Sequence, residues 1–356
     1  MKKLIILLLV VFVLDMEAQI VFHDAGKFPL LGKASTETET RYERLPASLK
    51  GIVRDPVWSL GKNAAGLAIR FSSNSTTISA RWTVLNDNSM NHMAPTGIKG
   101  LDLYTLENGK WMFVNCGRPG DAGKSKEAVI VSNMLKKDRE FMLFLPLYDG
   151  VTSLSIGVDS LADISLPKTD LPVRNQPVVC YGTSILQGGC ASRPGMAHTN
   201  ILMNRLNREF INLGFSGNGR LDYEIAEVMA NIKHVALFIL DFVPNASVEE
   251  IRDKTERFYS IIRNKHPDTP ILFVENPIYT HTKFDKKVNE GVTEKNKMIN
   301  EVYTVLRKKD KNIQLLSSKN MIGDDGEATV DGVHFTDLGF IRYADLLTSE
   351  IKKMID

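Results

Sequence analysis

The chain has 356 residues, 43% of them hydrophobic and 24% charged, an ordinary globular composition with room for two cores. Its formal net charge is +2, and no run of Lys and Arg is longer than the one at 307–309. This charge distribution indicates neither a nucleic-acid partner nor binding to an anionic membrane surface.

The N-terminus has the pattern of an export signal. Lys2 and Lys3 precede an uninterrupted apolar run, residues 4–14, and Ala18 offers a small side chain near the cleavage point. This run is too short to span a bilayer, which takes about 20 residues. An uncleaved anchor or a buried strand is the alternative. We expect residues 1–18 to be removed, leaving an exported protein, periplasmic or extracellular, that has no membrane span.

Residues 19–168 are predicted to form short strands separated by turns. Apolar and polar side chains alternate around Ile78 and Trp82, as on a strand with one buried face. Asn108 and Gly109 predict a hairpin, because both residue types accept positive φ. No helical stretch of useful length is apparent, so we predict an all-β domain, a β-sandwich of jelly-roll type. The predicted strands are 67–71, 76–84, 101–106, 111–116, 128–132, 140–145 and 153–158.

From residue 173 to residue 356, apolar strands alternate with amphipathic helices. This alternation is typical of a parallel sheet covered by helices on both faces, so we predict a three-layer α/β/α domain. The stretch 166–172, with a proline near each end, marks the boundary between the domains. The predicted strands are 177–181, 235–242, 271–274 and 313–317, and the predicted helices are 197–210, 221–232, 247–266, 292–308 and 336–355.

The three cysteines, Cys116, Cys180 and Cys190, are an odd number, so at least one thiol is unpaired. Cys116 and Cys180 lie in apolar strand-like runs, where a small buried hydrophobe is the expected role. Cys190 could form a disulfide, but nothing in the spacing of the cysteines requires one. The sequence contains no Cys-x-x-Cys or His-x-x-x-His spacing, so we predict no metal site and no cofactor.

Ser184 follows the apolar strand 178–181, with Gly182 between them. In a parallel α/β sheet, functional groups collect at the carboxyl ends of the strands, which is where this serine would lie. A serine needs a neighbouring base before it can act as a nucleophile. Taken alone, Ser184 would be interpreted as a turn or N-cap residue.

His334 is the candidate base, and Asp331 lies three residues before it. A carboxylate at this spacing can bind one ring nitrogen and keep the other facing the serine as an acceptor. Their structural alternatives are a turn at Asp331 and a surface histidine before a helix capped by Thr336. The three residues together favour a serine hydrolase over these separate interpretations.

Acyl transfer also needs hydrogen-bond donors directed at the developing oxyanion. The glycine-rich segment 212–219 can present a bare backbone N–H, and Asn245 follows the most apolar strand of the chain. A strand-to-helix turn is the alternative for the glycines, and an Asx turn or helix N-cap is the alternative for Asn245.

The order of these blocks resembles that of the SGNH (GDSL-type) hydrolases. The likeness extends to the lipase-like branch whose N-terminal β-domain is named for a Gly-x-Asp-Leu-Tyr motif, which residues 100–104 match. Residues 182–195 are similar to the nucleophile block of that branch. Two departures are present, Thr183 in place of the Asp of Gly-Asp-Ser, and Val-Pro-Asn at 243–245 in place of Gly-x-Asn-Asp.

The resemblance implies a flavodoxin-like parallel sheet and a role for each site residue. Ser184 would be the nucleophile, with its own N–H joining Gly217 N–H and the Asn245 amide in the oxyanion hole. His334 would act as base and then as acid, oriented by Asp331. The implied activity is hydrolysis of small acyl esters, with an acylated small molecule or glycan as substrate and acetyl esters of carbohydrate as the first expectation.

Substrate contacts are less constrained by the sequence. Arg193, Asp102 and Tyr104 are possible residues of the substrate rim, although Asp102 and Tyr104 are interpreted first as domain structure. The polar loop 85–96, which contains His92, could line a cleft or be an ordinary solvated loop. An esterase or thioesterase for lipid or other small acyl esters is one alternative function. A glycan-binding protein with a vestigial hydrolase domain is another.

Overall fold

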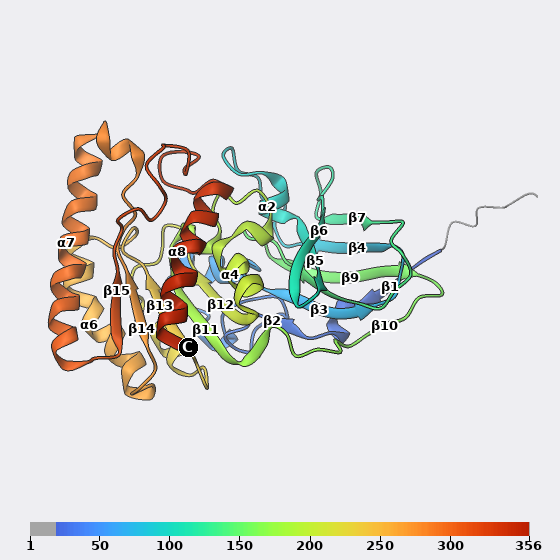
Figure 1. Cartoon of the computed structure of the whole chain (residues 1–356), viewed down its shortest axis with the longest axis horizontal. Coiled ribbons are helices and arrows are strands. Elements are labelled where there is room, and N and C mark those ends of the chain that lie inside the picture. Colours follow the sequence, from blue (N-terminus) through green and yellow to red (C-terminus); the bar gives the residue numbers. More distant parts are fainter. Residues whose placement is uncertain (1–18, 356) are drawn as a thin grey trace, which may run out of the picture.

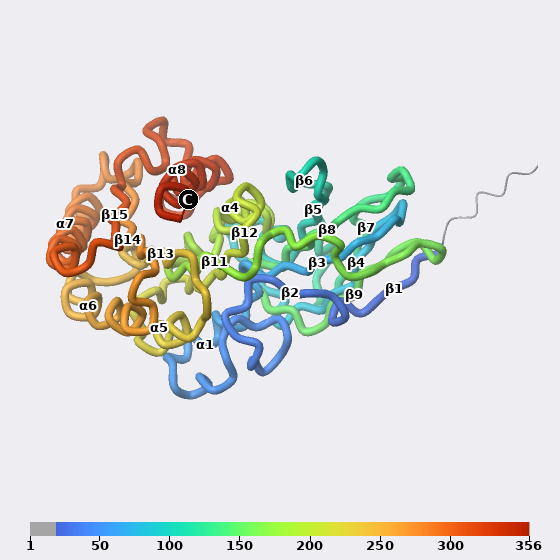
Figure 2. Tube along the Cα trace, turned by 60° about the horizontal axis from the view of Figure 1, so that its bottom comes forward, coloured from blue at the N-terminus to red at the C-terminus, as the bar shows by residue number. Residues whose placement is uncertain are grey.

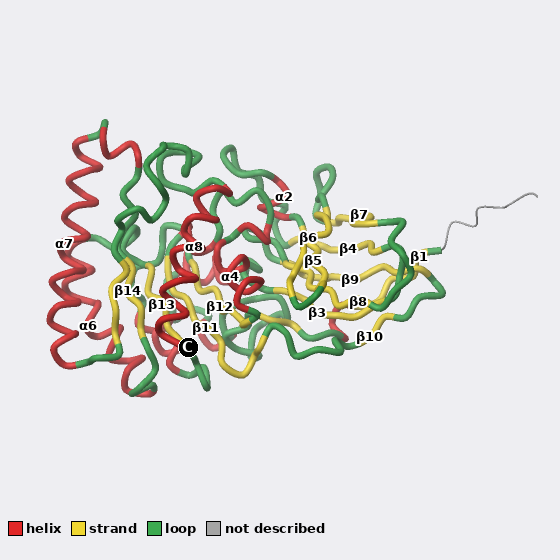
Figure 3. Tube along the Cα trace, in the orientation of Figure 1, coloured by secondary structure: helices red, strands yellow, loops and turns green. Residues whose placement is uncertain are grey.

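The computed structural model describes residues 19–355, and these fold into two domains joined end to end (Figure 1). One domain is built from antiparallel strands and the other from parallel strands with helices around them (Figure 3). The predicted export signal lies outside the described residues. Within 19–355, no helix has the length and apolarity needed to cross a membrane.

The first domain contains two antiparallel sheets, which confirms the predicted all-β domain, while the jelly-roll assignment stays a prediction. One sheet has the order β1-β9-β4-β7, and the other has the order β10-β3-β8-β5-β6 with β2 paired to β3. The strands are β1 (Ile20–Asp24), β2 (Leu30–Leu31), β3 (Ala68–Ser73), β4 (Ile78–Val84), β5 (Leu101–Glu107), β6 (Lys110–Gly117), β7 (Ser125–Val131), β8 (Arg139–Phe144), β9 (Val151–Asp159) and β10 (Ile164–Ser165).

The core of this domain lies between the inner faces of the two sheets. Ile78 and Trp82 of β4 are buried in it, as their alternation predicts, together with Phe71 of β3. Asn108 and Gly109 both have positive φ, 52° and 76°, and join β5 to β6 in the predicted hairpin.

The second domain is a parallel sheet of order β12-β11-β13-β14-β15 between two helical layers, as predicted. Its strands are β11 (Val173–Gly182), β12 (Arg208–Gly214), β13 (Leu237–Asp241), β14 (Ile271–Val274) and β15 (Ile313–Leu316). Its α-helices are α3 (Ser184–Gln187), α4 (His198–Leu206), α5 (Tyr223–Ala230), α6 (Val248–Lys265), α7 (Lys286–Lys309) and α8 (Asp337–Ile355). Short 3-10 helices in the described chain are Ala25–Lys27, Ala47–Leu49, Pro194–Met196 and Thr280–Lys283.

Successive side chains of β11 point to opposite faces of the sheet and so belong to two separate core clusters of the second domain. Val178 and Cys180 belong to the cluster that also contains buried residues of α4 and α8. Val179 and Tyr181 belong to the cluster that contains buried residues of α5 and α6. Both faces of this central strand are therefore buried, which explains why its sequence is a continuous apolar run instead of an alternating one.

Two local predictions are wrong. The helix predicted over 197–210 ends at Leu206, because Asn207 adopts a left-handed conformation (φ 47°) and the following residues pair with β11 as β12. The first domain also contains short helices, α1 (Asp55–Gly61) and α2 (Pro95–Lys99). Each has a proline in its first turn, a position that the missing N–H of proline suits.

The segment from residue 33 to residue 62 leaves the β-domain and packs against the parallel sheet (Figure 2). Val53 and Val57 are buried in the same cluster as Tyr181. Arg44 is 1% exposed and its guanidinium donates to the carbonyl oxygens of Asn212 and Gly214, at 3.0 and 2.8 Å. The two domains therefore share packing at the carboxyl end of β12, next to the candidate site.

Candidate active site

Ser184 is the first residue of α3, immediately after the carboxyl end of β11. Thr183 is the N-cap, and its Oγ1 accepts from the backbone N–H of Ile185 at 3.3 Å. The capping role considered for Ser184 is thus filled by Thr183, which leaves the Ser184 hydroxyl free. A side chain at Gly182 would meet the carbonyl oxygen of Asp241 at 2.5 Å, so glycine is needed where β11 approaches β13.

The structure brings Ser184, His334 and Asp331 together in one hydrogen-bonded chain. His334 Nε2 lies 2.9 Å from Ser184 Oγ, and His334 Nδ1 lies 2.7 Å from Asp331 Oδ2. The other oxygen of Asp331 accepts from the backbone N–H groups of Val333 and His334. Burial opposes ionisation of Asp331, but these hydrogen bonds outweigh it and lower its pKa to about 2. Asp331 is thus a carboxylate at neutral pH, fixed to the ring nitrogen remote from the serine.

Three donors near Ser184 have no acceptor among the described residues. They are the backbone N–H groups of Ser184 and Gly217 and the side-chain amide of Asn245. Gly217 has a φ of 67° and open space around its Cα, in a loop that packs directly against β11. Unpartnered donors beside a hydroxyl that is hydrogen-bonded to histidine are what an oxyanion hole requires.

The orientation of Asn245 is set by its neighbours. Asn245 Oδ1 accepts from the backbone N–H of Gly219 at 3.2 Å, so the amide nitrogen is the end left free. The helix that follows is capped by Ser247, whose side chain and that of Glu250 form a capping box. The N-cap alternative considered for Asn245 is therefore filled by Ser247.

Asp102 and Tyr104 are buried, 0% and 6% exposed, which favours their first interpretation as domain structure over a place on the substrate rim. Asp102 Oδ2 instead accepts from Arg193 Nη1 at 2.7 Å and from the backbone N–H of Gly195 at 2.8 Å. The Tyr104 hydroxyl accepts from the same Arg193 nitrogen at 2.8 Å. The Gly-x-Asp-Leu-Tyr motif of the β-domain therefore anchors the loop that follows the nucleophile, and Arg193 is used in that anchor.

Other β-domain residues reach the nucleophile itself. The Tyr148 hydroxyl donates to the backbone oxygen of Ser184 at 3.2 Å, and Gln187 of α3 donates to the backbone oxygen of Leu147 at 3.1 Å. Thr96 donates from its hydroxyl to the backbone oxygen of Ser192 at 2.5 Å. These contacts show that the β-domain forms part of the wall behind Ser184.

Substitution of Asp102 by Asn is expected to destabilise the protein and slow the reaction at Ser184. Arg193 would keep its charge but lose a carboxylate that is fully buried, and breaking such a pair costs about 3 kcal/mol. Urea unfolding and kcat/KM on p-nitrophenyl acetate measure the two effects. Asp121→Asn, at an exposed residue of the same domain, is the control. Matching unfolding curves for the two variants would contradict the anchoring role.

Two neighbours of the triad were noted in the sequence, His92 in a loop that could line a cleft and Cys190 as a cysteine that could pair, but neither was placed at the triad. The ring of His92 lies beside that of His334, with centroids 5.5 Å apart and planes at 57°. Cys190 is buried, forms no disulfide within residues 19–355, and has a pKa raised to about 12 by burial and by Asp331. The polarity of the loop that holds His92 was the one available signal, and nothing in the spacing pointed to Cys190.

A cavity of about 220 Å³ opens beside Ser184. Part of its wall is apolar, from Ile185, Val292 and Val333, and part is polar, from Asn245 and Asn276. Its remaining lining residues are Pro244, Tyr279, Val288, Gly291 and Lys295. The cavity is therefore large enough for an acyl group next to the nucleophile and presents apolar surface to it.

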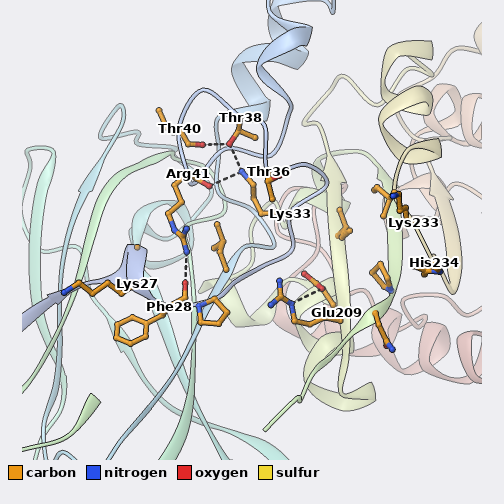
Figure 4. Close-up of a pocket in the computed structure, with 18 of the residues that line it drawn as sticks. Lys27, Phe28, Lys33, Thr36, Thr38, Thr40, Arg41, Glu209, Lys233 and His234 are labelled. Atoms are coloured by element: carbon orange, nitrogen blue, oxygen red, sulfur yellow. Dashed lines mark hydrogen bonds and ion pairs between the residues drawn. The ribbon is translucent and has the colours of Figure 1, made fainter. Parts of the chain in front are cut away.

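A second cavity, of about 850 Å³, lies away from the triad, where the β-domain meets the parallel sheet (Figure 4). Its polar groups are largely bonded to one another. Lys33 Nζ donates to the hydroxyl of Thr38 and to the backbone oxygen of Arg41, and Arg41 donates to the backbone oxygen of Phe28. It contains no arrangement of nucleophile and base comparable to that at Ser184.

Comparison with protein families gives two matches that together cover most of the chain. The GDSL-like Lipase/Acylhydrolase family matches residues 175–352. The N-terminal domain of SGNH-type esterases, named GxDLY, matches residues 20–164. A search of curated proteins found no match.

Solved structures with the same two-domain extent include one of high identity. A GDSL-like lipase from Bacteroides ovatus is 41% identical, with a TM-score of 0.89, covering 94% of this chain and 98% of its own. The salicylyl-acyltransferase SsfX3 from a tetracycline biosynthetic pathway is 15% identical, with a TM-score of 0.75, covering 95% and 99%. A family two carbohydrate esterase from Cellvibrio japonicus is 12% identical, with a TM-score of 0.59, covering 95% and 99%. The last two show likeness of fold alone.

Proposed function

This chain belongs to the GDSL-like lipase and acylhydrolase (SGNH hydrolase) family, and on that premise we propose that it is an exported serine esterase for small acyl esters. We propose acetyl esters of carbohydrate as its substrates. The observation that supports the chemistry most directly is the hydrogen-bonded chain from Ser184 through His334 to Asp331, at 2.9 and 2.7 Å.

In this mechanism, Ser184 Oγ attacks the ester carbonyl while His334 Nε2 takes the hydroxyl proton. His334 then gives that proton to the leaving alcohol, and the acyl group stays on Ser184. Water attacks the acyl-enzyme with His334 again acting as the base, which releases the acid and restores the serine. Asp331 holds the His334 tautomer that accepts from Ser184 and stabilises the imidazolium formed in each half of the cycle.

The negative charge on the tetrahedral intermediate needs donors already in place. The free N–H groups of Ser184 and Gly217 and the amide of Asn245 are assigned this role. A donor of this kind typically lowers the barrier by about 3 kcal/mol, because it needs no reorganisation during the reaction.

Two observations support a small acyl group on a carbohydrate. The C. japonicus carbohydrate esterase shares the fold over 95% of this chain, so carbohydrate esters are among the substrates that this fold can accommodate. The cavity beside Ser184, about 220 Å³, has ample room for an acetyl group. Esters of longer apolar acids are the second candidate, favoured by the apolar part of that cavity around Val292 and Val333.

Acetate release from acetylated xylan, pectin and mannan tests the substrate class. The wild type is expected to release acetate from at least one polysaccharide, and a p-nitrophenyl ester series is expected to show the highest kcat/KM at acetate. A rise with acyl chain length would favour the lipid-type candidate. Binding to these polysaccharides without hydrolysis of any ester would favour a vestigial hydrolase domain. N-terminal sequencing of the exported protein, expected to begin near Gln19, tests export.

A further inference from the structure

His92, Cys190, Asp331 and His334 form a group of metal-ligand type at the triad. Their donor atoms, from two imidazoles, one thiol and one carboxylate, all lie within 4.8 Å of one another. Imidazole nitrogen and thiolate sulfur are the ligands that Zn²⁺ and related divalent transition metals prefer. A search of the sequence for closely spaced ligands, such as Cys-x-x-Cys, could not find this group, because its members come from three separate loops.

The two residues outside the triad are suited to ligation. His92 Nδ1 lies 3.1 Å from Asn91 Oδ1, and an Nδ1–H donated to that oxygen leaves Nε2 as the free acceptor. Cys190 is buried beside Asp331 with its thiol unpaired. Neither side chain is a member of the hydrogen-bonded chain from Ser184 through His334 to Asp331. The proton-transfer chain therefore does not account for their presence at the triad.

We propose that this group binds Zn²⁺ or a similar divalent transition metal and that the bound metal inhibits the esterase reversibly. His92 and Cys190 supply two ligands, and His334 and Asp331 complete the site. As the metal–sulfur bond forms, the Cys190 thiol loses its proton to solvent. A metal held by His334 or Asp331 interrupts the chain from Ser184 to Asp331, so that binding and hydrolysis exclude each other. The inhibition rests on the proposed esterase function, whereas the binding does not.

The geometry requires only a small closure. Zn–N and Zn–S bonds of about 2.0 and 2.3 Å in a tetrahedral site place ligand atoms about 3.3–3.6 Å apart. Donor atoms as far apart as 4.8 Å must therefore approach by roughly 1 Å, while the hydrogen-bonded atoms of His334 and Asp331, at 2.7 Å, must separate slightly if both bind the metal. His92 belongs to the loop between β4 and α2 and is partly exposed, so side-chain rotation can supply that movement.

Titration of the purified protein with Co²⁺ tests the binding. A thiolate-to-cobalt charge-transfer absorption, together with the visible bands of tetrahedral Co²⁺, is expected in the wild type and should disappear when Zn²⁺ is added. The charge-transfer band is expected to be absent in Cys190→Ser and retained in Cys116→Ser, the matched control. No such band in the wild type, or an equal band in Cys190→Ser, would overturn the proposal.

Inhibition is measured on p-nitrophenyl acetate, with each variant compared with its own metal-free rate. Zn²⁺ is expected to inhibit the wild type, and EDTA to restore it. Loss of one ligand in His92→Ala or Cys190→Ser should raise the inhibitory Zn²⁺ concentration by about 10- to 100-fold or more. His23→Ala, in β1, should leave it unchanged. Equal Zn²⁺ sensitivity in all variants would refute inhibition through this group of ligands. A cobalt spectrum without any esterase activity would refute the proposed function and leave the metal site standing.

Discussion

Ser184→Ala is expected to abolish ester hydrolysis, with a fall in kcat on the order of 10⁶-fold. Within residues 19–355, Ser184 is the only residue whose hydroxyl is hydrogen-bonded to His334, so without it no acyl-enzyme can form. Its fold should persist, because the backbone contacts of Ser184 with Tyr148 and with the turn of α3 are unchanged. Hydrolysis of p-nitrophenyl acetate and thermal unfolding measure the two properties separately.

A matched control and a covalent probe make this prediction sharper. Ser89→Ala removes an exposed hydroxyl from the loop that also holds His92, and its activity should equal that of the wild type. A fluorophosphonate should add to the wild type at Ser184, as located by peptide mass spectrometry, and should not react with Ser184→Ala. Activity or labelling that survives in Ser184→Ala would show that another group is the nucleophile.

The fold could be predicted because each half of the chain repeats one simple pattern. Period-two alternation, as in β4, indicates an antiparallel sheet with one face toward solvent. Uninterrupted apolar strands, as in β13, indicate a parallel sheet buried on both faces. The packing of residues 33–62 against the second domain could not be predicted. Arg44 is buried there and its guanidinium is hydrogen-bonded to backbone oxygens of β12. Such bonds leave no periodic signal in the sequence.

The candidate triad could be predicted because each member belongs to a short local motif at the end of an element. Asp331 and His334 are three residues apart, and only Ser184 had to be brought to them by the fold. Asp102 was interpreted first as domain structure and only second as a rim residue, and its burial favours the first interpretation. Its partner, Arg193, lies 91 residues away, and a pairing at that separation follows from the docking of the two domains.

The positions of the neighbours of the triad also depend on how the two domains pack against each other, so they could not be predicted from local sequence. His92 comes from the β-domain and Cys190 from the loop after α3, and neither carries a motif of its own. The anchor at Asp102 and the contact of Tyr148 with Ser184 hold the β-domain against the nucleophile loop. The β-domain therefore shapes the site physically, and a hydrolase domain alone would lack one side of it.

His334→Ala is expected to lower kcat by about as much as Ser184→Ala, and the double variant should be no slower than either single variant. The serine and histidine act as one unit, since the hydroxyl is a poor nucleophile without a base. Asp331→Asn should cost less, about 10⁴-fold. The replacement amide can donate to His334 Nδ1 and so favour the tautomer that cannot accept from Ser184.

Steady-state kinetics on p-nitrophenyl acetate measure the loss of kcat in the three single variants and the double variant, with His23→Ala as a histidine control in β1. Additive losses in the double variant would mean that Ser184 and His334 act independently. The pH profile adds a second check. The folded pKa of Asp331, about 2, lies below its ordinary value, so the carboxylate's contribution is present at neutral pH and is lost only as the pH falls toward 2. The Asp331 carboxylate should therefore remain ionised from neutral to mildly acidic pH, which the carboxyl ¹³C chemical shift in an NMR titration measures, and a titration of this carboxyl at its ordinary pKa would contradict the hydrogen-bonded arrangement with His334.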